Sequence, residues 1–184
     1  MRVTISSSSN ELIDEKYKKS AIKLNDFLAS NGCDLNWGSG SISIMGICYN
    51  EFLKYERKIY GYTSPKYKDD IDNLKKAEHK IFDTTFDLKK NIFNDADLLV
   101  MLPGGTGTIS EFFSYLEEIR SNDINIPLII YNEDNHFDST LKLIDDLVSR
   151  NFNSKSIYDY FKVANTFEEF KDMFYDIKKN SKIR

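Results

Sequence analysis

The sequence predicts an α/β domain built on a doubly wound, mostly parallel sheet with helices on both faces. Short β-rich runs alternate with longer helical patterns along the whole chain. Such alternation is typical of a parallel sheet that helices cover. The run Asp97–Leu102 is almost continuously apolar, as in a strand buried on both faces. We expect one domain over residues 1–184, because no repeat, linker or low-complexity tract divides the chain.

The strands are expected where β-branched and aromatic residues cluster between turn signals. In chain order they are Val3–Ser6, Cys33–Trp37, Lys58–Tyr62, Ile81–Phe82, Asp97–Leu102, Pro127–Tyr131 and Phe161–Ala164. The polar stretch between the third and fourth strands, Ser64–Asn73, is expected to be a long loop.

The helices are expected where apolar residues recur three or four positions apart, as they do from Ile13 to Leu28 before the stop signal Asn31-Gly32. The later ones are expected at Ile47–Tyr55, Leu74–His79, Leu88–Asn94, Ile109–Ile119, Ser139–Val148 and Phe167–Ile177.

Composition argues against several classes of function. The net charge of −4 disfavours a general nucleic-acid binder, whose footprint is normally basic. No apolar run approaches the roughly 18 residues that a membrane span needs, and the N-terminus lacks the apolar core of a secretory signal. Cys33 and Cys48 form no CxxC pair and make no metal-binding pattern with the two distant histidines. We therefore expect a cytoplasmic protein with reduced thiols and no metal, nucleic-acid or membrane partner.

The stretch VMLPGGTGTISEFFSYL, residues 100–116, holds three of the chain's 8 glycines within four positions. Glycines directly after a buried strand allow the backbone to approach a ligand closely. The helix expected to start near Thr106–Thr108 would present unpaired N–H groups and its positive dipole end, which suits phosphate. The stretch is neither a Walker A loop nor a dinucleotide GxGxxG motif. A tight strand-to-helix turn without a ligand is the alternative.

Glu111 has two interpretations at this stage. Thr108-Ile-Ser-Glu111 fits a capping box, in which the glutamate folds back onto the first amide of the helix. Alternatively, Glu111 projects towards whatever the glycine loop binds. A carboxylate beside a bound phosphosugar suits N-glycosidic cleavage, in which positive charge develops on the sugar.

Ligands of doubly wound sheets bind outside the carboxyl ends of the strands, where the strand order reverses. Three loops are candidates for this position: Ser6–Ser9, Gly38–Ser43 and Pro103–Thr108. His79 and His136 have no partner pattern, so no catalytic role is assigned to them. Trp37 could stack on a base, although packing at the strand end is the preferred interpretation.

The run PGGTGTISE resembles the PGGxGTxxE signature of the Lonely-guy (LOG) family, whose members were long misannotated as lysine decarboxylases. The turn GSGSISIMG, Gly38–Gly46, is similar to the family's GGGxxGLMG turn, and ISSSS, Ile5–Ser9, lies where the family has its CGSSS loop. The resemblance extends over roughly Val3–Phe174, nearly the whole chain.

The resemblance implies a Rossmann-like homodimer that hydrolyses a nucleoside 5′-monophosphate to free base and ribose 5-phosphate, without a metal or redox cofactor. Glu111 would face the ribose and stabilise the transition state. The residues that would hold the phosphate are Gly104, Gly105, Thr106, Gly107 and Thr108. Those around the rest of the nucleotide would be Ser7, Ser8, Gly40 and Met45.

The sequence departs from the family at one catalytic position. LOG proteins usually carry Glu-Arg-Lys where this chain has Asp87-Leu88-Lys89, so Leu88 stands in place of the catalytic arginine. Lys89 or Lys90 could reach the site and supply a cation to the nucleotide, although solvated surface lysines are the alternative. Ser6, Ser39 and Ser43 replace family glycines. Two functions therefore stay open: a nucleotide N-glycosidase or related nucleoside transferase, and a non-catalytic nucleotide-binding or sensing module of the same fold.

Overall fold

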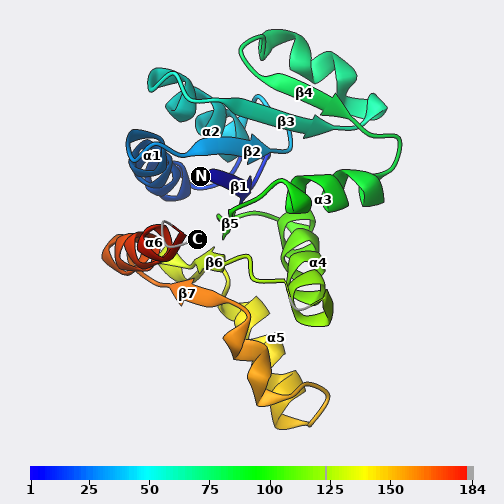
Figure 1. Cartoon of the computed structure of the whole chain (residues 1–184), viewed down its shortest axis with the longest axis vertical. Coiled ribbons are helices and arrows are strands. Elements are labelled where there is room, and N and C mark those ends of the chain that lie inside the picture. Colours follow the sequence, from blue (N-terminus) through cyan, green and yellow to red (C-terminus); the bar gives the residue numbers. More distant parts are fainter. Residues whose placement is uncertain (123, 182–184) are drawn as a thin grey trace.

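The computed structural model, which describes residues 1–122 and 124–181, contains one sheet of seven parallel strands flanked by helices (Figure 1). The strands are β1 (Arg2–Ser6), β2 (Asp34–Trp37), β3 (Ile59–Thr63), β4 (Glu78–Ile81), β5 (Leu98–Met101), β6 (Leu128–Tyr131) and β7 (Lys162–Ala164). The α-helices are α1 (Glu15–Ser30), α2 (Ser43–Lys54), α3 (Thr85–Asn94), α4 (Thr106–Asn122), α5 (Asp138–Ser149) and α6 (Phe167–Ser181).

The strand order is β4-β3-β2-β1-β5-β6-β7. The chain moves outward from β1 to β4, returns to the centre at β5, and then moves outward on the other side. The order therefore reverses between β1 and β5, which pair in parallel with Ile5 opposite Val100 and Ser6 opposite Met101. The expected doubly wound Rossmann-like fold is confirmed, and the sheet is parallel at every strand pair.

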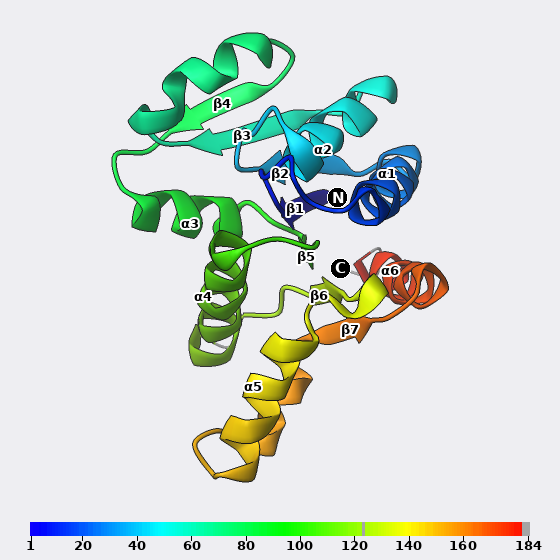
Figure 2. The same ribbon diagram turned by 180° about the vertical axis from the view of Figure 1, so that it is seen from behind.

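The two faces of the sheet are covered by different helices, as the two opposite views show (Figures 1 and 2). Successive strand residues point to opposite faces. Val100 and Ile129 pack in the core formed with α1, α2 and α6, whereas Met101 and Ile130 pack in the core formed with α3, α4 and α5. Burial on both sides explains why β5 and β6 are apolar throughout.

The region between β3 and α3 differs from the expectation. The helix expected over Leu74–His79 is wrong, because Glu78–Ile81 forms β4 and pairs with β3, Gly61 lying opposite His79. This strand lies at the edge of the sheet and is mostly exposed, so it lacks the apolar pattern of the central strands. The preceding segment, Pro65–Asn73, contains 3₁₀ turns.

Two helices begin earlier than expected. α2 begins at Ser43 rather than Ile47, directly after the glycine-bearing turn. α3 begins at Thr85 rather than Leu88, because the Thr84 side chain accepts a hydrogen bond from the Asp87 amide, 3.0 Å away, and caps the helix. Within the described part of the chain, no helix has both the length and the apolar character that a membrane crossing requires.

Candidate functional site

The three candidate loops meet at the carboxyl edge of the sheet, around the point where the strand order reverses. The Ser8 amide donates to the Pro103 carbonyl at 3.1 Å, and the Met45 amide donates to the Ser8 carbonyl at 3.2 Å. The Leu102 amide also donates to Ser6 at 2.9 Å. The loop after β1 is thus bonded both to the glycine loop after β5 and to the first turn of α2, and the backbone forms a continuous rim for a ligand.

The glycine loop leads directly into α4, whose first residue is Thr106. The Ile109 amide bonds the Gly105 carbonyl at 3.1 Å, so the regular helix bonds start there. The amides of Thr106, Gly107 and Thr108 precede this bond and have no partner within the helix. Gly105, Thr106 and Gly107 are exposed. This helix start therefore offers unpaired N–H groups and a positive dipole end to an anion.

The glycines of this loop serve different purposes. A Cβ on Gly104 would overlap the Thr108 hydroxyl, so Gly104 is required by the packing of the turn itself. A Cβ on Gly105 or Gly107 would meet no atom within 4 Å. Gly105 does not adopt a positive φ, since Gly32 is the one glycine with positive φ among residues 1–122 and 124–181. The space beside Gly105 is therefore open and not filled by protein.

Glu111 is the sixth residue of α4, in its second turn, and does not form a capping box. Because α4 begins at Thr106, Thr108 is inside the helix and cannot be its N-cap. The carboxylate instead hydrogen-bonds the side chain of Ser6 at the end of β1. Part of the residue stays accessible to solvent, but burial raises the pKa of Glu111, while the Ser6 hydrogen bond and the charge of Lys89 oppose that shift. The carboxylate therefore lies beneath the glycine loop, at the reversal of strand order.

A family model described as possible lysine decarboxylase matches residues 45–173, well over half of the chain. The chain belongs to the LOG family. Among curated relatives, a rice (Oryza sativa subsp. japonica) protein named a probable cytokinin riboside 5′-monophosphate phosphoribohydrolase is 26% identical over 84% of this chain and 62% of its own length. An Arabidopsis thaliana protein of the same activity name is 28% identical over 80% of this chain and 68% of its own length.

Solved structures share the fold of this LOG protein at low sequence identity. The molybdenum cofactor carrier protein of Chlamydomonas reinhardtii superposes with a TM-score of 0.70 at 13% identity. The superposition covers 97% of this chain and 98% of that one. At this level of sequence identity, the superposition shows a shared fold and nothing about function.

At the position of the LOG arginine, Leu88 is half-buried and packs against the core beneath α3 and α4. The next residue, Lys89, points to the site instead: its ammonium group lies 2.7 Å from the Ser110 hydroxyl and acts electrostatically on Glu111. Adjacent helical positions differ by about 100°, so the two side chains point in different directions. Ser6, which replaces a LOG glycine, contributes the hydroxyl that contacts Glu111.

Tyr115 is a second polar neighbour of Glu111, one helical turn further along α4. It is 1% exposed, and its hydroxyl lies beside Ser6 without a hydrogen bond of acceptable geometry. Burial and the charge of Glu111 raise the pKa of Tyr115 well above its usual range, so the hydroxyl stays protonated. Sequence patterns did not reveal this residue, because its apolar spacing on α4 is that of an ordinary core position.

The remaining residues that the LOG resemblance suggested lie around the rim. Ser8 is buried and its hydroxyl accepts from the Asn10 amide at 3.0 Å, while the buried Ser7 hydroxyl has no partner among the described residues. The Met45 side chain covers Gly40, where a Cβ would collide with it.

Trp37 is fully buried and stacks on Tyr49 with ring centroids 5.8 Å apart. It therefore packs in the core and does not present a surface on which a base could stack.

His136 reaches the glycine loop, a contact that the sequence did not indicate. Its Nε2 atom lies 3.1 Å from the Gly104 amide nitrogen and 2.9 Å from the Gly104 carbonyl oxygen. The two residues are 32 positions apart in the chain. The one available signal was its place shortly after β6, where another carboxyl end of the sheet is expected.

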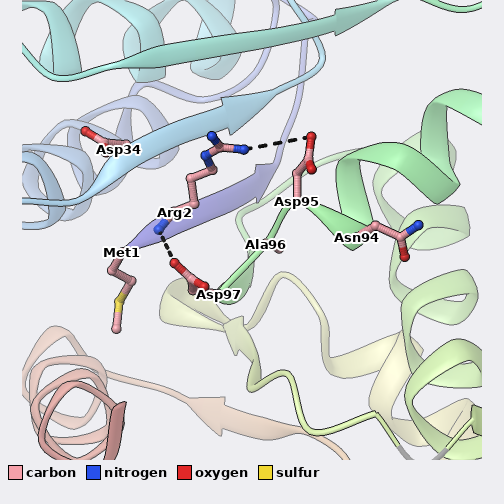
Figure 3. A pocket seen from close by; sticks show the side chains of 7 residues that line it. All are labelled: Met1, Arg2, Asp34, Asn94, Asp95, Ala96 and Asp97. Atoms are coloured by element: carbon pink, nitrogen blue, oxygen red, sulfur yellow. Dashed lines mark hydrogen bonds and ion pairs between the residues drawn. The ribbon is translucent and has the colours of Figure 1, made fainter. Parts of the chain in front are cut away.

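A polar pocket of about 400 Å³ lies at the opposite, amino edge of the sheet (Figure 3). Arg2 lines it together with three carboxylates, Asp34, Asp95 and Asp97. Asp95 is paired with Lys80 at 2.6 Å and with Arg2 at 3.8 Å, and Asp97 accepts from the Arg2 amide at 2.7 Å. Lys80 and Arg2 thus compensate the charge of Asp95, and the pocket is separated by the length of the strands from the site at the carboxyl edge.

Proposed function

We propose that the protein is a nucleotide N-glycosidase that hydrolyses a nucleoside 5′-monophosphate to free base and ribose 5-phosphate. The position of Glu111 carries this proposal. A carboxylate lies near the start of α4, whose unpaired amides suit an anion, at the reversal of strand order, where doubly wound domains bind their ligands. The activity names of the plant relatives support the same substrate class.

The reaction follows from this arrangement. The 5′-phosphate binds the amides of Thr106, Gly107 and Thr108, which directs the ribose towards Glu111. The C1′–N bond breaks, and its electron pair leaves with the base, which takes a proton from solvent. Positive charge develops on the sugar, and the Glu111 carboxylate stabilises it. A water molecule then adds to C1′ and gives its proton to Glu111, completing ribose 5-phosphate.

The neighbours of Glu111 suit this role. An oxocarbenium-like transition state is stabilised by an ionised carboxylate, yet burial favours the protonated form. The Ser6 hydroxyl and the ammonium group of Lys89 both favour the ionised form. Lys89 thus supplies, from the neighbouring position, part of the positive charge that the LOG arginine would bring.

The test is incubation with a panel of nucleoside monophosphates, with release of free base measured by chromatography. Glu111→Gln keeps the size of the side chain and removes its charge. We expect its rate to fall by roughly 10² or more, the scale of losing about 3 kcal/mol of transition-state stabilisation. Glu118→Gln, an exposed change in the same helix, is the matched control and should leave the rate unchanged. Equal rates for wild type and Glu111→Gln would refute the mechanism.

Leu88 favours a second candidate, a module that binds nucleotides without cleaving them. A leucine neither carries charge nor donates hydrogen bonds, and its side chain packs into the core. This function predicts that the wild type binds a nucleoside monophosphate, as measured by calorimetry, but releases no base from any member of the panel. If the wild type releases free base from any nucleoside monophosphate, the glycosidase is favoured over the non-catalytic binding module.

A further inference from the structure

Three adjacent strands, β2, β3 and β4, bring Trp37, Gly61 and His79 into one row (Figure 1). The register places Trp37 opposite Gly61, and Gly61 opposite His79. Side chains in such a row point to the same face of the sheet. Because Gly61 has no side chain, the rings of Trp37 and His79 meet over it, with their centroids 6.0 Å apart.

The His79 ring reaches the loop that follows β2. Its Nδ1 atom lies 3.1 Å from the Ser39 hydroxyl oxygen, and its Nε2 atom lies 3.2 Å from the Leu74 carbonyl oxygen. A carbonyl oxygen only accepts, so Nε2 carries a proton and donates it to Leu74. In the neutral ring Nδ1 therefore accepts from Ser39, and in the protonated ring Nδ1 donates to Ser39. The contact with Ser39 is kept in both charge states.

Gly61 makes room for this contact. A Cβ at this position would overlap both the Ser39 hydroxyl and the His79 ring. β3 is buried along its length, and a glycine inside a strand weakens it. The glycine in β3 therefore serves the passage of the His79 side chain to Ser39.

Ser39 has a backbone conformation that needs such support. Its φ of 56° lies in the left-handed region, which residues other than glycine adopt only where their surroundings enforce it. The residue is 2% exposed, so water does not replace His79 as the partner of its hydroxyl. The Trp37 indole N–H donates to the Gly40 carbonyl at 3.2 Å. His79 and Trp37 together hold the turn at residues 38–40.

This turn belongs to the rim of the proposed site. The Ser43 hydroxyl donates to the Asn10 carbonyl at 2.6 Å and ties the end of the loop to the loop after β1. The Met45 amide donates to the Ser8 carbonyl, and the Ser8 amide donates to the Pro103 carbonyl before the glycine loop. The turn after β2 and the glycine loop are therefore parts of one bonded rim.

We propose that His79 is a positioning residue of the nucleotide site, which holds Ser39 in its left-handed conformation and keeps the turn at residues 38–40 preformed for the nucleotide. The inference rests on the proposed nucleotide site at the carboxyl edge of the sheet. A glycine adopts a positive φ without support, whereas Ser39 obtains the same φ through the hydrogen bond to His79. Without that bond, fewer molecules hold the binding conformation, and the apparent affinity falls by the same fraction.

The experiment measures the affinity for adenosine 5′-monophosphate by calorimetry in the Glu111→Gln background, which slows cleavage of the ligand. His79→Phe keeps a ring over Gly61 and removes both hydrogen bonds. We expect its affinity to be roughly tenfold lower, because the left-handed conformation of Ser39 loses its support. His79→Asn offers an amide oxygen near the place of Nδ1 and should retain most of the affinity. Glu78→Gln, an exposed change in the same strand, is the matched control and should bind unchanged.

A second variant separates a role through Ser39 from a general effect on β4. Ser39→Gly takes up the left-handed conformation without the hydrogen bond. In that background His79→Phe should lower the affinity by less than about twofold. Gly61→Ala breaks the same contact from the other side, because its Cβ displaces both partners, and should also lower the affinity roughly tenfold. Thermal melts establish that each variant is folded.

Three results would overturn the role of His79 while leaving the nucleotide site intact. They are an unchanged affinity in folded His79→Phe, an unchanged affinity in folded Gly61→Ala, and an equal loss for His79→Phe with and without Ser39→Gly. If neither the wild type nor the Glu111→Gln protein binds any nucleoside monophosphate, the proposed nucleotide site is rejected, and this inference with it.

Discussion

The ammonium group of Lys89 in α3 lies 2.7 Å from the hydroxyl of Ser110 in α4, the residue directly before Glu111. This contact joins the two helices at the carboxyl edge of the sheet. It brings a positive charge to the carboxylate of Glu111 from the position next to the family's arginine, whose own place is taken by the half-buried Leu88.

Replacement of Lys89 with methionine is expected to lower kcat/KM for base release by roughly tenfold at neutral pH. Loss of the charge removes an interaction that lowers the pKa of Glu111, so that pKa rises further. The acidic limb of the pH–rate profile should therefore move to higher pH. Lys90→Met, at the exposed neighbouring position, is the control and should leave the profile in place. The prediction is wrong if the two variants behave alike.

Glu111→Gln is expected to stabilise the protein at neutral pH. Burial raises the pKa of Glu111 above its ordinary value of 4.5, so the folded state binds this proton more tightly than the unfolded state. Its contribution to stability is therefore lost as the pH rises from 4.5 through the folded-state pKa. Glutamine is neutral at every pH. Thermal melts should show a higher Tm for the variant than for the wild type at pH 7.5, and this Tm difference should shrink towards pH 4. A Tm difference that stays constant with pH would contradict a raised pKa of Glu111 in the folded protein.

Gly105→Val is expected to abolish nucleotide binding while the protein stays folded. A Cβ at Gly105 meets no protein atom within 4 Å, so the valine side chain occupies the space where a phosphate would approach. Gly104→Ala provides the contrast, because its Cβ overlaps Thr108 and should destabilise the turn by about 1–3 kcal/mol. Calorimetry with adenosine 5′-monophosphate and thermal melts separate the two effects. Unchanged affinity in folded Gly105→Val would mean that the turn is only structural.

The protein is expected to be a homodimer, as the family resemblance implies. Leu12 in the loop after β1 and Phe86 in the first turn of α3 are 93% and 73% exposed, and both lie at the carboxyl edge of the sheet. A partner subunit would cover such side chains. Light scattering should give twice the chain mass of 21.4 kDa. Phe86→Asp should lower that mass, whereas Phe152→Asp, at an exposed position after α5, should not. A concentration-independent monomer mass would reject the dimer.

The sequence alone was sufficient for the fold class and for the glycine turn that leads from β5 into α4. Strands such as β5 are buried on both faces and therefore apolar throughout, and the helices show their core-facing spacing, so local patterns carried this information. The glycine run after β5 and the start of α4 could also be predicted, since a strand-to-helix turn depends on residues that are neighbours in the sequence. The edge strand β4 was expected three residues too late, at Ile81–Phe82, because it is mostly exposed and lacks an apolar pattern.

Only the tertiary structure decided what surrounds the carboxylate. The absence of a capping box at Glu111 depends on where α4 begins, and the orientation of Lys89 rather than Leu88 depends on the rotation of α3 against α4. The contacts of Glu111 with Ser6 and of His136 with Gly104 join residues far apart in the chain. Such contacts arise from the spatial order of the parallel strands in the sheet. Because neither partner's local sequence records that order, no pattern along the chain could have predicted them.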